Sequence, residues 1–471
     1  MSDWDVVVLG GGTGGYVAAI RGTQLGLRVA LVEAGKLGGT CLHLGCIPTK
    51  ALLRSAEVYV AAKNGGSFGV MAESVRFDWG QALARKRQIV DQLTKGIEYL
   101  MKKHQVRVIE GYGRVMGSSI FSPTAGAVRV HRNGEEEVLT PRYTIIATGS
   151  RPRGLPGLPF DGKRVLSSDD LLARETLPDS IAIIGGGAIG IEWASLCADV
   201  GVKVTVIEAL PRILFHEDED VAVEMARALK KRGVRVLVNA MVAADATDFT
   251  DDGVKLSVTV RGHAETITAS VVLVAIGRAA NIEDIGLEAT GVKVDRGVIV
   301  VDDRMRTDEK SIYAIGDVIG RLQLAHAAAH EGMVAMEAMA GLEPEPIRYE
   351  LVARATYGRP EVASVGITEA QARERGYEVK VGKFPFRALG KALVYGETDG
   401  FVKLVVDAKQ NDVLGVHMIG PHVTDLIAEG ALAQVVNAAP WEIGHTIHPH
   451  PTLSEALGEA ALAVDGGAIH L

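Results

Sequence analysis

The stretch VVVLGGGTGG at residues 6–15 decides how the chain begins to fold. Its first four residues are apolar β-formers and predict a buried strand, and the glycines after them predict a turn. Gly10, Gly12 and Gly15 match the pattern G-x-G-x-x-G. In that pattern the glycines permit a tight turn, close approach of a pyrophosphate to the backbone, and close packing of a helix on a strand.

The residues that follow complete a strand–turn–helix–strand unit. Residues 16–25 favour a helix, and residues 28–32 favour a second strand that leads to Glu33, 18 positions after Gly15. The helix N-terminus can hold the phosphates of a dinucleotide, and the acidic residue can bind ribose hydroxyls. Because the strands and the acid accompany the glycines, this segment is predicted to bind a dinucleotide.

The same unit returns further along the chain. IAIIGGGAIG occupies residues 181–190, and residues 203–207 predict the strand that follows the helix. Each key position lies 175 residues after its counterpart in the first unit, at Gly185, Gly187, Gly190 and Glu208. Two units in the same register predict two dinucleotide sites. At the second site a carboxylate favours NAD, because it would repel the additional phosphate of NADP.

The composition is that of an ordinary globular protein, with 47% hydrophobic and 23% charged residues in a chain of 471. Such a length predicts about three domains. The net charge of −8 argues against nucleic-acid binding, and no apolar run is long enough for a membrane span. No targeting segment is expected before the first strand, and few cysteines indicate a reducing compartment, so we expect a cytoplasmic protein.

Two of the three cysteines, Cys41 and Cys46, lie five positions apart. A disulfide needs Cα atoms within about 7 Å, which a regular helix does not give at this spacing, but Gly45 and Pro48 allow the backbone to depart from helical geometry. A helix start nearby would also stabilise a thiolate. The pattern predicts a redox-active dithiol, with two unrelated buried thiols as the alternative. Since Cys197 is the remaining cysteine, no metal site is expected.

Later segments add polar groups at places where α/β sheets bind ligands. Predicted strands end at Gly149 and Gly277, and residues 311–316 predict a strand that delivers Asp317 at its C-terminal end. Asp317 is therefore a candidate ligand carboxylate, with an ordinary acid as the alternative. The stretch HPHPTLSE at residues 448–455 brings histidines close to a carboxylate, which suits general acid–base chemistry, although surface histidines in a turn would give the same pattern.

After about residue 346 the pattern changes. Residues 401–406 and 413–418 flank a turn and predict antiparallel strands, so this part is predicted to be a separate domain with helices and an antiparallel sheet. The predicted fold class is therefore α/β, with two Rossmann-like dinucleotide-binding domains and a C-terminal α+β domain.

Together these motifs resemble the pyridine nucleotide–disulfide oxidoreductases, over nearly the whole chain from Gly10 to Glu455, and are most similar to the members that oxidise dihydrolipoyl groups. The resemblance implies FAD on the first unit, NAD on the second, and an obligate homodimer formed by the C-terminal domain. The domains that it implies are an FAD-binding domain at 1–149, an NAD-binding domain at 150–278, a second part of the FAD or central domain at 279–345, and an interface domain at 346–471.

The resemblance also implies the roles of individual residues. Catalysis falls to Cys41, Cys46, His450 and Glu455, with the histidine reaching the disulfide of the other subunit. The expected FAD contacts are Gly10, Gly12, Gly15, Glu33, Gly39, Thr40, Lys50, Gly113, Thr148, Gly149, Asp317 and Ala325. The expected NAD site comprises Gly185, Gly187, Ile189, Gly190, Glu192, Glu208 and Gly277, with Glu192 paired to the lysine near the flavin.

The implied reaction oxidises a dihydrolipoyl group of a 2-oxo acid dehydrogenase or glycine cleavage complex and passes electrons through the disulfide and FAD to NAD. The implied partners are a lipoyl domain, carried by an acyltransferase or a glycine cleavage carrier, and a peripheral-subunit-binding region. The chain departs from the family at His43, where asparagine is more frequent, and at Ala280, where proline is usual. Neither change removes a chemical group that the reaction needs.

Two other functions remain open. A related reductase could run from a nicotinamide to glutathione, another disulfide or mercuric ion. Glutathione-type enzymes use NADP and want arginines near Glu208, where only Arg212 is close, and mercuric reductases carry a C-terminal cysteine pair that this chain does not have. A flavin-bearing scaffold without turnover is the other alternative, and the presence of both cysteines with His450 and Glu455 argues against it.

Overall fold

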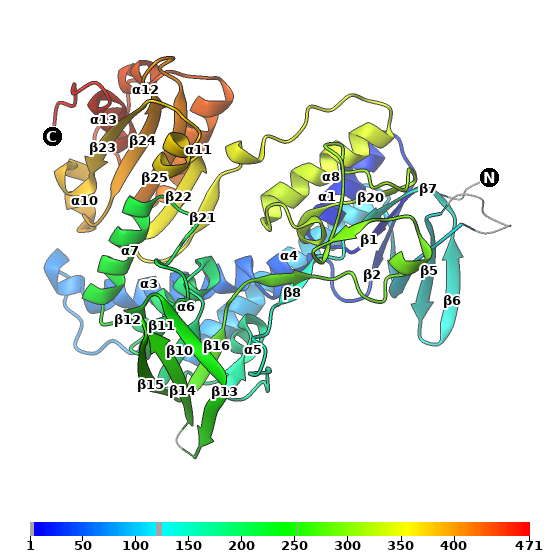
Figure 1. Ribbon diagram of the computed structural model, residues 1–471, viewed down its shortest axis with the longest axis horizontal. Coiled ribbons are helices and arrows are strands. Elements are labelled where there is room, and N and C mark those ends of the chain that lie inside the picture. The colour runs from blue at the N-terminus through cyan, green and yellow to red at the C-terminus, as the bar shows by residue number, and fades with distance from the viewer. Residues whose placement is uncertain (1–3, 119–124, 252) are drawn as a thin grey trace. The chain divides into compact units, whose positions relative to one another are not determined.

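The computed structural model describes residues 4–118, 125–251 and 253–471, which form two compact units built from discontinuous segments (Figure 1). The first unit contains the chain up to Ala51, Leu83–Arg153 and Arg278–Tyr349. The second contains Leu52–Ala82, Gly154–Gly277 and Glu350–Leu471.

The first unit is built on a parallel sheet in the order β20–β7–β1–β2–β3. Its strands are β1 (Trp4–Leu9), β2 (Val29–Glu33), β3 (Arg107–Glu110), β7 (Pro141–Ile146) and β20 (Ile312–Ala314). Helix α1 (Thr13–Gln24) packs closely on α8 (Ala325–Met339). Gly332 of α8 allows this approach, because a Cβ there would lie only 2.8 Å from the carbonyl oxygen of Gly14. Helix α1 begins three residues earlier than the sequence pattern indicated, since Gly12 caps it from within the glycine turn.

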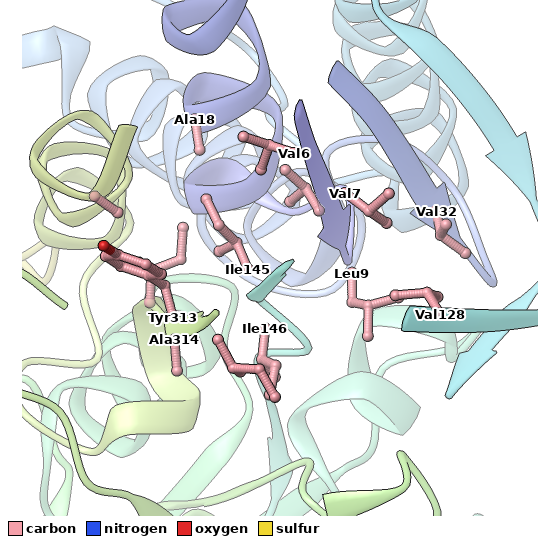
Figure 2. Close-up of a cluster of buried hydrophobic side chains, with 14 of the residues drawn as sticks. Val6, Val7, Leu9, Ala18, Val32, Val128, Ile145, Ile146, Tyr313 and Ala314 are labelled. Atoms are coloured by element: carbon pink, nitrogen blue, oxygen red, sulfur yellow. The ribbon is translucent and has the colours of Figure 1, made fainter. Parts of the chain in front are cut away.

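The core of this sheet explains why its strands are almost wholly apolar. Val6 and Val7 are completely buried, and Figure 2 shows them among side chains from β1, β2, β5, β7, β20 and α1. A strand that is covered on both faces needs a continuous apolar run rather than an alternating one. Each fully buried side chain of this size contributes roughly 1.5–3 kcal/mol to folding.

The remaining elements of the first unit surround this sheet. An antiparallel sheet is formed by β4 (Tyr112–Met116), β5 (Ala127–Arg132) and β6 (Glu135–Leu139). A two-stranded ribbon pairs β8 (Ser150–Pro152) with β17 (Arg278–Ala280), and another pairs β18 (Val294–Asp295) with β19 (Val298–Ile299). The helices are α2 (Gly39–His43) and two that continue into segments of the second unit, α3 (Cys46–Lys63) and α4 (Trp79–Lys103).

The second unit contains a second parallel sheet, in the order β12–β11–β10–β16–β9. Its strands are β9 (Val165–Leu166), β10 (Ser180–Ile184), β11 (Lys203–Ile207), β12 (Arg235–Leu237) and β16 (Val271–Val274). The accompanying helices are α5 (Ser168–Ala173), α6 (Ala188–Asp199) and α7 (Glu219–Lys231). An antiparallel meander of β13 (Ala240–Thr250), β14 (Gly253–Val260) and β15 (His263–Ala269) completes this part.

The C-terminal part of the second unit is an antiparallel sheet in the order β21–β22–β25–β24–β23. Its strands are β21 (Arg354–Thr356), β22 (Glu361–Gly366), β23 (Val379–Pro385), β24 (Phe401–Asp407) and β25 (Val413–Gly420). Its helices are α9 (Glu369–Glu374), α10 (Gly390–Tyr395), α11 (Val423–Val435), α12 (Pro440–His445) and α13 (Glu455–Ala463). The predicted fold class, with two Rossmann-like parts and a C-terminal α+β part, is confirmed.

Across residues 4–118, 125–251 and 253–471, no helix combines the length and the apolar character needed to cross a membrane.

Candidate active site

Each of the three glycines of the first dinucleotide motif is needed for a different structural reason. Gly10 has a φ of +103°, and a Cβ there would lie 2.3 Å from the carbonyl oxygen of Ala147. A Cβ on Gly15 would lie 1.8 Å from the carbonyl oxygen of Gly10, so this glycine lets α1 pack on the turn. A Cβ on Gly12 would meet no atom closer than 4.0 Å. The open space at Gly12 is what a pyrophosphate needs when it approaches the backbone at the N-terminus of α1.

Glu33 is held rigidly at the carboxyl end of β2. Its Oε2 accepts a hydrogen bond of 2.6 Å from the Gly11 amide, and its Oε1 accepts one of 2.6 Å from the Gly35 amide. The carboxylate is therefore fixed beside the glycine turn, where it can receive a ribose hydroxyl.

The second motif repeats this geometry in the second unit. A Cβ on Gly185 would lie 2.3 Å from the Ala275 oxygen and one on Gly190 would lie 2.0 Å from the Gly185 oxygen, whereas Gly187 has nothing within 4 Å. Glu208 accepts hydrogen bonds of 2.6 Å from the Gly186 amide and 2.8 Å from the Leu210 amide. Even the partners of the two acids are therefore offset by 175 residues, and both turns have space for a dinucleotide.

The surroundings of Glu208 favour NAD over NADP. Arg212 is the nearby cation that could have received a 2′-phosphate, but it donates to the Phe215 carbonyl at 3.1 Å and its guanidinium lies 4.7 Å from the centre of the Phe215 ring. The carboxylate of Glu208 keeps its own two amide bonds. A fixed carboxylate matches ribose hydroxyls and repels a phosphate.

Three further residues predicted for the NAD site also lie in the second unit. Ile189 is in the first turn of α6, and Gly277 has a φ of +118° with no atom within 4 Å of the point where a Cβ would lie. Glu192 is buried in α6 and its carboxylate accepts a hydrogen bond of 2.9 Å from the Tyr357 amide. These contacts place the residues but leave their roles at the dinucleotide a prediction.

The cysteine pair spans a break between two helices. Cys41 lies on α2, and Cys46 is the first residue of α3. Leu44 ends α2 with a φ of −131°. The Thr49 amide, in the first turn of α3, donates a hydrogen bond of 3.1 Å to the Gly45 carbonyl. This is the departure from helical geometry that the sequence predicted, and it places Cys46 at a helix N-terminus, where a thiolate is stabilised.

The two sulfurs are free thiols in this structure and share a hydrogen bond. The hydrogen bond with Cys46, together with burial and the charge of Cys46, raises the pKa of Cys41, and a bond from Thr13 and the charge of Lys50 only partly oppose this. Cys46, as the first residue of α3, is the better placed of the two to carry a thiolate.

The cysteine loop is docked directly on the first glycine motif. The Gly38 amide donates to the Gly11 carbonyl at 2.8 Å, and a Cβ on Gly39 would lie 2.7 Å from the Gly12 Cα. Thr40 belongs to the same turn, and its carbonyl accepts the Leu44 amide at 2.8 Å. A dinucleotide bound at Gly12 would therefore lie beside the dithiol within a single unit.

Asp317 lies three residues after the end of β20, which is shorter than the strand predicted at residues 311–316, and has a defined support. It is in a 3₁₀ turn at Gly316–Ile319, and its carboxylate accepts a short hydrogen bond from the Ser150 hydroxyl. Arg278 donates to that hydroxyl at 2.7 Å and to the Ser150 carbonyl at 2.8 Å. The Gly316 amide is held by the buried carboxylate of Glu331 at 2.6 Å. The turn is thus fixed from two sides.

The other residues predicted to contact FAD lie in the same unit but are not all explained by a ligand. A Cβ on Gly113 would lie 2.4 Å from a Leu9 methyl carbon, so packing alone accounts for that glycine. The Thr148 hydroxyl donates to the Asn281 carbonyl at 2.7 Å, Gly149 has a φ of +70°, and Ala325 begins α8.

A cavity of 690 Å³ lies beside Glu33 and the cysteine loop. Lys36, His43 and Lys95 are among its lining residues, and His43 contacts the Leu37 carbonyl through Nε2 at 2.8 Å. The departure from the family pattern at His43 therefore changes the wall of this cavity. The other departure, Ala280, lies in β17 opposite Ser150 and its carbonyl accepts a bond from Arg151 at 3.1 Å.

His450 and Glu455 form a pair in the second unit. His450 Nδ1 lies 2.8 Å from Glu455 Oε1, and the Thr452 amide donates to the other carboxylate oxygen at 2.8 Å. The His450 side chain is 80% exposed, so its Nε2 is free to meet a substrate. A carboxylate that orients one ring nitrogen while the other faces outward is the arrangement of a general base.

Several residues beside these sites were missed by the sequence interpretation. Thr13 and Tyr16 come from the first turn of α1 and lie close to Cys41, and Ser150 and Arg278 support Asp317. The hydroxyl of Thr13, inside the glycine motif, was the one available signal. Over residues 4–118, 125–251 and 253–471, no group of three or more His, Cys, Asp or Glu residues is arranged to hold a metal ion.

Comparisons with known proteins agree with this arrangement. Residues 4–332 match the family model described as pyridine nucleotide-disulphide oxidoreductase, and residues 352–461 match the dimerisation domain of the same family. The protein of Bacillus subtilis named dihydrolipoyl dehydrogenase is 57% identical over 100% of this chain and 99% of its own. A protein of the same name from Zymomonas mobilis is 45% identical over 99% of both chains.

Solved structures share this fold over nearly the whole chain. The crystal structure of LpdA from Mycobacterium tuberculosis has a TM-score of 0.89 at 28% identity, covering 97% of this chain and 98% of that one. The flavoprotein disulfide reductase RclA from Escherichia coli, in its Cu(II) complex, has a TM-score of 0.85 at 28% identity, covering 98% of this chain and 99% of that one.

Proposed function

The chain belongs to the pyridine nucleotide-disulphide oxidoreductase family, and we propose that it oxidises dihydrolipoyl groups to the lipoyl disulfide, using the Cys41–Cys46 pair, FAD and NAD⁺. The observation that carries the proposal is the dithiol docked on the first dinucleotide turn, with Cys46 at the start of α3. Its support is a full-length relative of that activity at 57% identity.

The residues present fit both cofactors. In the first unit the open turn at Gly12, the fixed carboxylate of Glu33 and the supported Asp317 suit the pyrophosphate, ribose and ribitol of FAD. In the second unit Gly187 and Glu208 suit NAD in the same way. We assign the parts 1–149 and 279–345 to FAD, 150–278 to NAD, and 346–471 to the interface. When bound, FAD supplies a two-electron carrier between the dithiol and the nicotinamide.

The protein's own residues carry out the thiol chemistry. His450 accepts the proton of one dihydrolipoyl thiol through Nε2, while Glu455 stabilises the imidazolium at Nδ1. The resulting thiolate attacks the Cys41 sulfur of the Cys41–Cys46 disulfide, which breaks, and Cys46 leaves as a thiolate.

The second half of the exchange closes the substrate ring. The other dihydrolipoyl thiol attacks the sulfur now bonded to Cys41, and its proton passes to the Cys41 sulfur that is released, so the lipoyl disulfide forms. The substrate is oxidised by two electrons and the cysteine pair is reduced by two. One proton is then on His450 and one on Cys41, and the charge stays on Cys46 at the start of α3.

The partners follow from the same proposal. The chain carries the family's dimerisation domain, and the His450–Glu455 pair of one subunit serves the cysteine pair of the other. A lipoyl domain of an acyltransferase, or of a glycine cleavage carrier, brings the substrate, and a peripheral-subunit-binding region holds the dimer in its complex. We place the protein in the cytoplasm, because a redox-active dithiol in a chain with three cysteines suits a reducing compartment.

The test is a steady-state assay of the FAD-loaded protein with free dihydrolipoamide and either NAD⁺ or NADP⁺. We expect NADH formation with NAD⁺ and little reaction with NADP⁺. Reduction by dihydrolipoamide in the absence of nucleotide should also give a long-wavelength thiolate–flavin absorption band. Preference for NADP⁺ would favour the disulfide reductase that runs in the opposite direction, and a spectrum without the band would favour the scaffold.

A further inference from the structure

The loop between α12 and α13 carries two histidines, and each contacts a carboxylate on a different helix. His450 contacts Glu455 of α13, as described above. His448 Nε2 lies 2.7 Å from Glu429 Oε1, and Glu429 belongs to α11. The His450 side chain is 80% exposed, whereas that of His448 is 9% exposed. The His448 ring is therefore largely buried, with Glu429 36% exposed, whereas the His450 ring faces outward.

We propose that His448 and Glu429 form a second histidine–carboxylate pair, which positions the His450–Glu455 pair. The inference rests on the proposed function, because His448 acts through His450 and does not touch the substrate. In this sense His448 and Glu429 are positioning residues.

Packing fixes the His448 ring between two helices. A Cβ on Gly458 would lie 3.1 Å from both Cε1 and Nδ1 of His448, so the ring lies directly on α13 one turn after Glu455. On the other side, α11 approaches the sheet so closely that a Cβ on Gly430 would lie 3.2 Å from the Val416 side chain. Glu429 therefore projects from a helix that cannot shift easily. A larger residue in place of Gly458 would push the ring away.

The backbone between the two histidines transmits this placement. Pro449 is the one residue between them, and proline fixes its own φ. The Thr452 hydroxyl donates to the Pro449 carbonyl at 2.8 Å, and the Thr452 amide donates to Glu455. When His448 is anchored, the position of His450 against Glu455 is determined over a few bonds.

Electrostatics also connect His448 to the His450–Glu455 pair. Burial raises the pKa of Glu455, but the Thr452 amide, the contact with His450 and the charge of His448 together outweigh burial and lower it. His448 therefore lies close enough to Glu455 to act on the catalytic pair.

Other titratable groups on the packed helices have partners elsewhere. On α12, Glu442 accepts the Ala439 amide at 2.8 Å and His445 contacts the Trp441 carbonyl at 2.8 Å. On α13, Glu459 contacts His470 at 2.7 Å, and Asp425 of α11 lies near Glu361.

The experiment uses the full-length, FAD-loaded protein and three variants, His448→Gln, Glu429→Gln and the control His470→Gln. His470 and Glu459 form a histidine–carboxylate pair of the same length as His448 and Glu429, and Glu459 lies in the middle of α13. The kcat and KM for dihydrolipoamide are measured for each protein. Flavin reduction by NADH is followed in parallel, because that step does not use His450.

We expect kcat/KM to fall about 10-fold or more in His448→Gln, since small misplacements of a catalytic group have effects of this size. The loss should appear in kcat rather than in KM, because His450 acts on the thiol proton in the chemical step. The loss should be smaller in Glu429→Gln, which leaves no uncompensated carboxylate. Flavin reduction by NADH should be unchanged, and His470→Gln should match the unmodified protein.

Two results would overturn the inference. One is a kcat/KM for His448→Gln within twofold of the unmodified protein. The other is a loss of kcat/KM that lies in KM with kcat unchanged, which would mean that His448 only shapes the loop around the substrate. Failure of the proposed function looks different, because the unmodified protein would then form no NADH from dihydrolipoamide, and both proposals would fall together.

Discussion

At the scale of single residues, the dinucleotide turns separate glycines needed for folding from glycines needed for binding. Gly187 has a φ of −77°, which alanine adopts without strain, and open space where its Cβ would lie. A Cβ on Gly190 would lie 2.0 Å from the carbonyl oxygen of Gly185. Of these two glycines in one motif, Gly187 thus tolerates a Cβ and Gly190 does not.

Gly187→Ala should therefore raise the KM for NAD⁺, with the melting temperature and FAD content unchanged, because the methyl group enters the space reserved for the pyrophosphate. Gly190→Ala should lower the melting temperature by separating α6 from the turn, at a free-energy cost of about 1–3 kcal/mol typical of overpacking. Calorimetry and NAD⁺ titration of the matched pair give the check. Equal effects of both variants on stability would contradict this division.

The two cysteines are also distinguished by their surroundings. Because Cys46 is at the start of α3 and the pKa of Cys41 is raised, the thiolate should reside on Cys46. Cys41→Ser should therefore keep a long-wavelength thiolate–flavin band and lose turnover. Cys46→Ser should lose both. The absorption spectrum of each FAD-loaded variant, recorded between pH 6 and 9, decides between the two assignments, and a band retained only in Cys46→Ser would reverse them.

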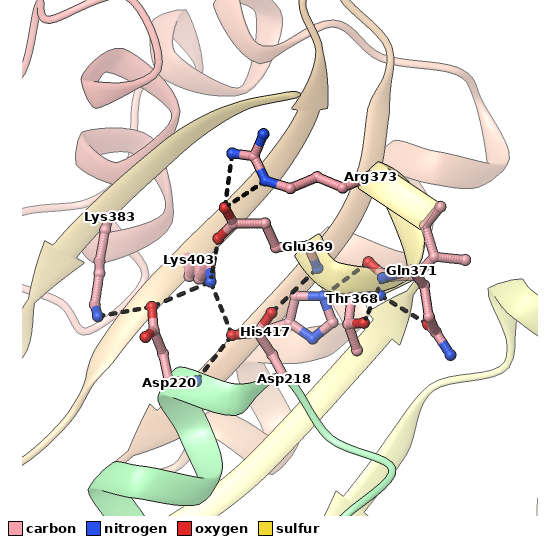
Figure 3. A network of polar contacts seen from close by, with 10 residues as sticks. Asp218, Asp220, Thr368, Glu369, Gln371, Arg373, Lys383, Lys403 and His417 are labelled. Carbon is pink, nitrogen blue, oxygen red and sulfur yellow. Dashed lines mark hydrogen bonds and ion pairs between the residues drawn. The ribbon is translucent and has the colours of Figure 1, made fainter. Parts of the chain in front are cut away.

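At the scale of elements, Lys403 joins α7 to the C-terminal sheet (Figure 3). Its ammonium lies 2.8 Å from Asp218, 3.1 Å from Asp220 and 2.8 Å from Glu369, while the side chain is 3% exposed. Asp218 caps α7, and Glu369 begins α9. One buried cation thus holds the ends of two helices against β24.

Lys403→Met should destabilise the protein by about 3–5 kcal/mol, because removing Lys403 leaves the buried carboxylate of Asp218 without compensation. The control is Lys383→Met, since Lys383 contacts Asp220 at 3.0 Å but is 43% exposed. An exposed pair contributes about 0–1 kcal/mol. Urea unfolding at pH 7 measures both, and similar losses would contradict a special role of Lys403.

The same cluster should contribute to acid sensitivity. Burial raises the pKa of Asp218 and Asp220, but their contacts with His417, Lys383 and Lys403 outweigh it, and Lys403 lowers the pKa of Glu369. All three pKa values are thus lower in the folded protein than in the unfolded chain. The stabilisation is complete above about pH 4, which is the ordinary pKa of these carboxyl groups in an unfolded chain. It is lost as the pH falls through their lower pKa values in the folded protein. Unfolding curves between pH 3 and 7 should show a smaller acid loss in Lys403→Met.

The elements that sequence alone predicted are those whose signal is local. Strands such as β10 and β11, and both glycine turns, follow from a few adjacent residues, because apolar runs and positive φ angles are properties of short segments. The supports of the site are different. The bonds from Ser150 to Asp317 and from His448 to Glu429 join segments separated by 167 and 19 residues, and they depend on how helices pack. No periodicity or spacing encodes such contacts.

At the scale of the whole molecule, the proposed reaction needs two chains, because in the proposal His450 of one subunit serves the Cys41–Cys46 pair of the other. Homodimers of Cys46→Ser or His450→Ala should both be inactive, the second by about 10²–10⁴-fold in kcat. A mixed dimer of these two chains, isolated through two different affinity tags, has one site with an intact pair and an intact histidine. It should recover about half of the unmodified activity if the histidine acts across the interface.

The matched control is a mixed dimer of an unmodified chain with a Cys46→Ser/His450→Ala chain. If the histidine acts across the interface, each site of this dimer lacks one of its two groups, and it should be inactive. If the histidine acts within its own chain, the results exchange, because the unmodified chain then keeps a complete site and the first mixed dimer has none. The two preparations contain the same four groups and differ only in how the chains share them. Their activities therefore report which chain's His450 serves which dithiol, independently of any effect of the substitutions on folding.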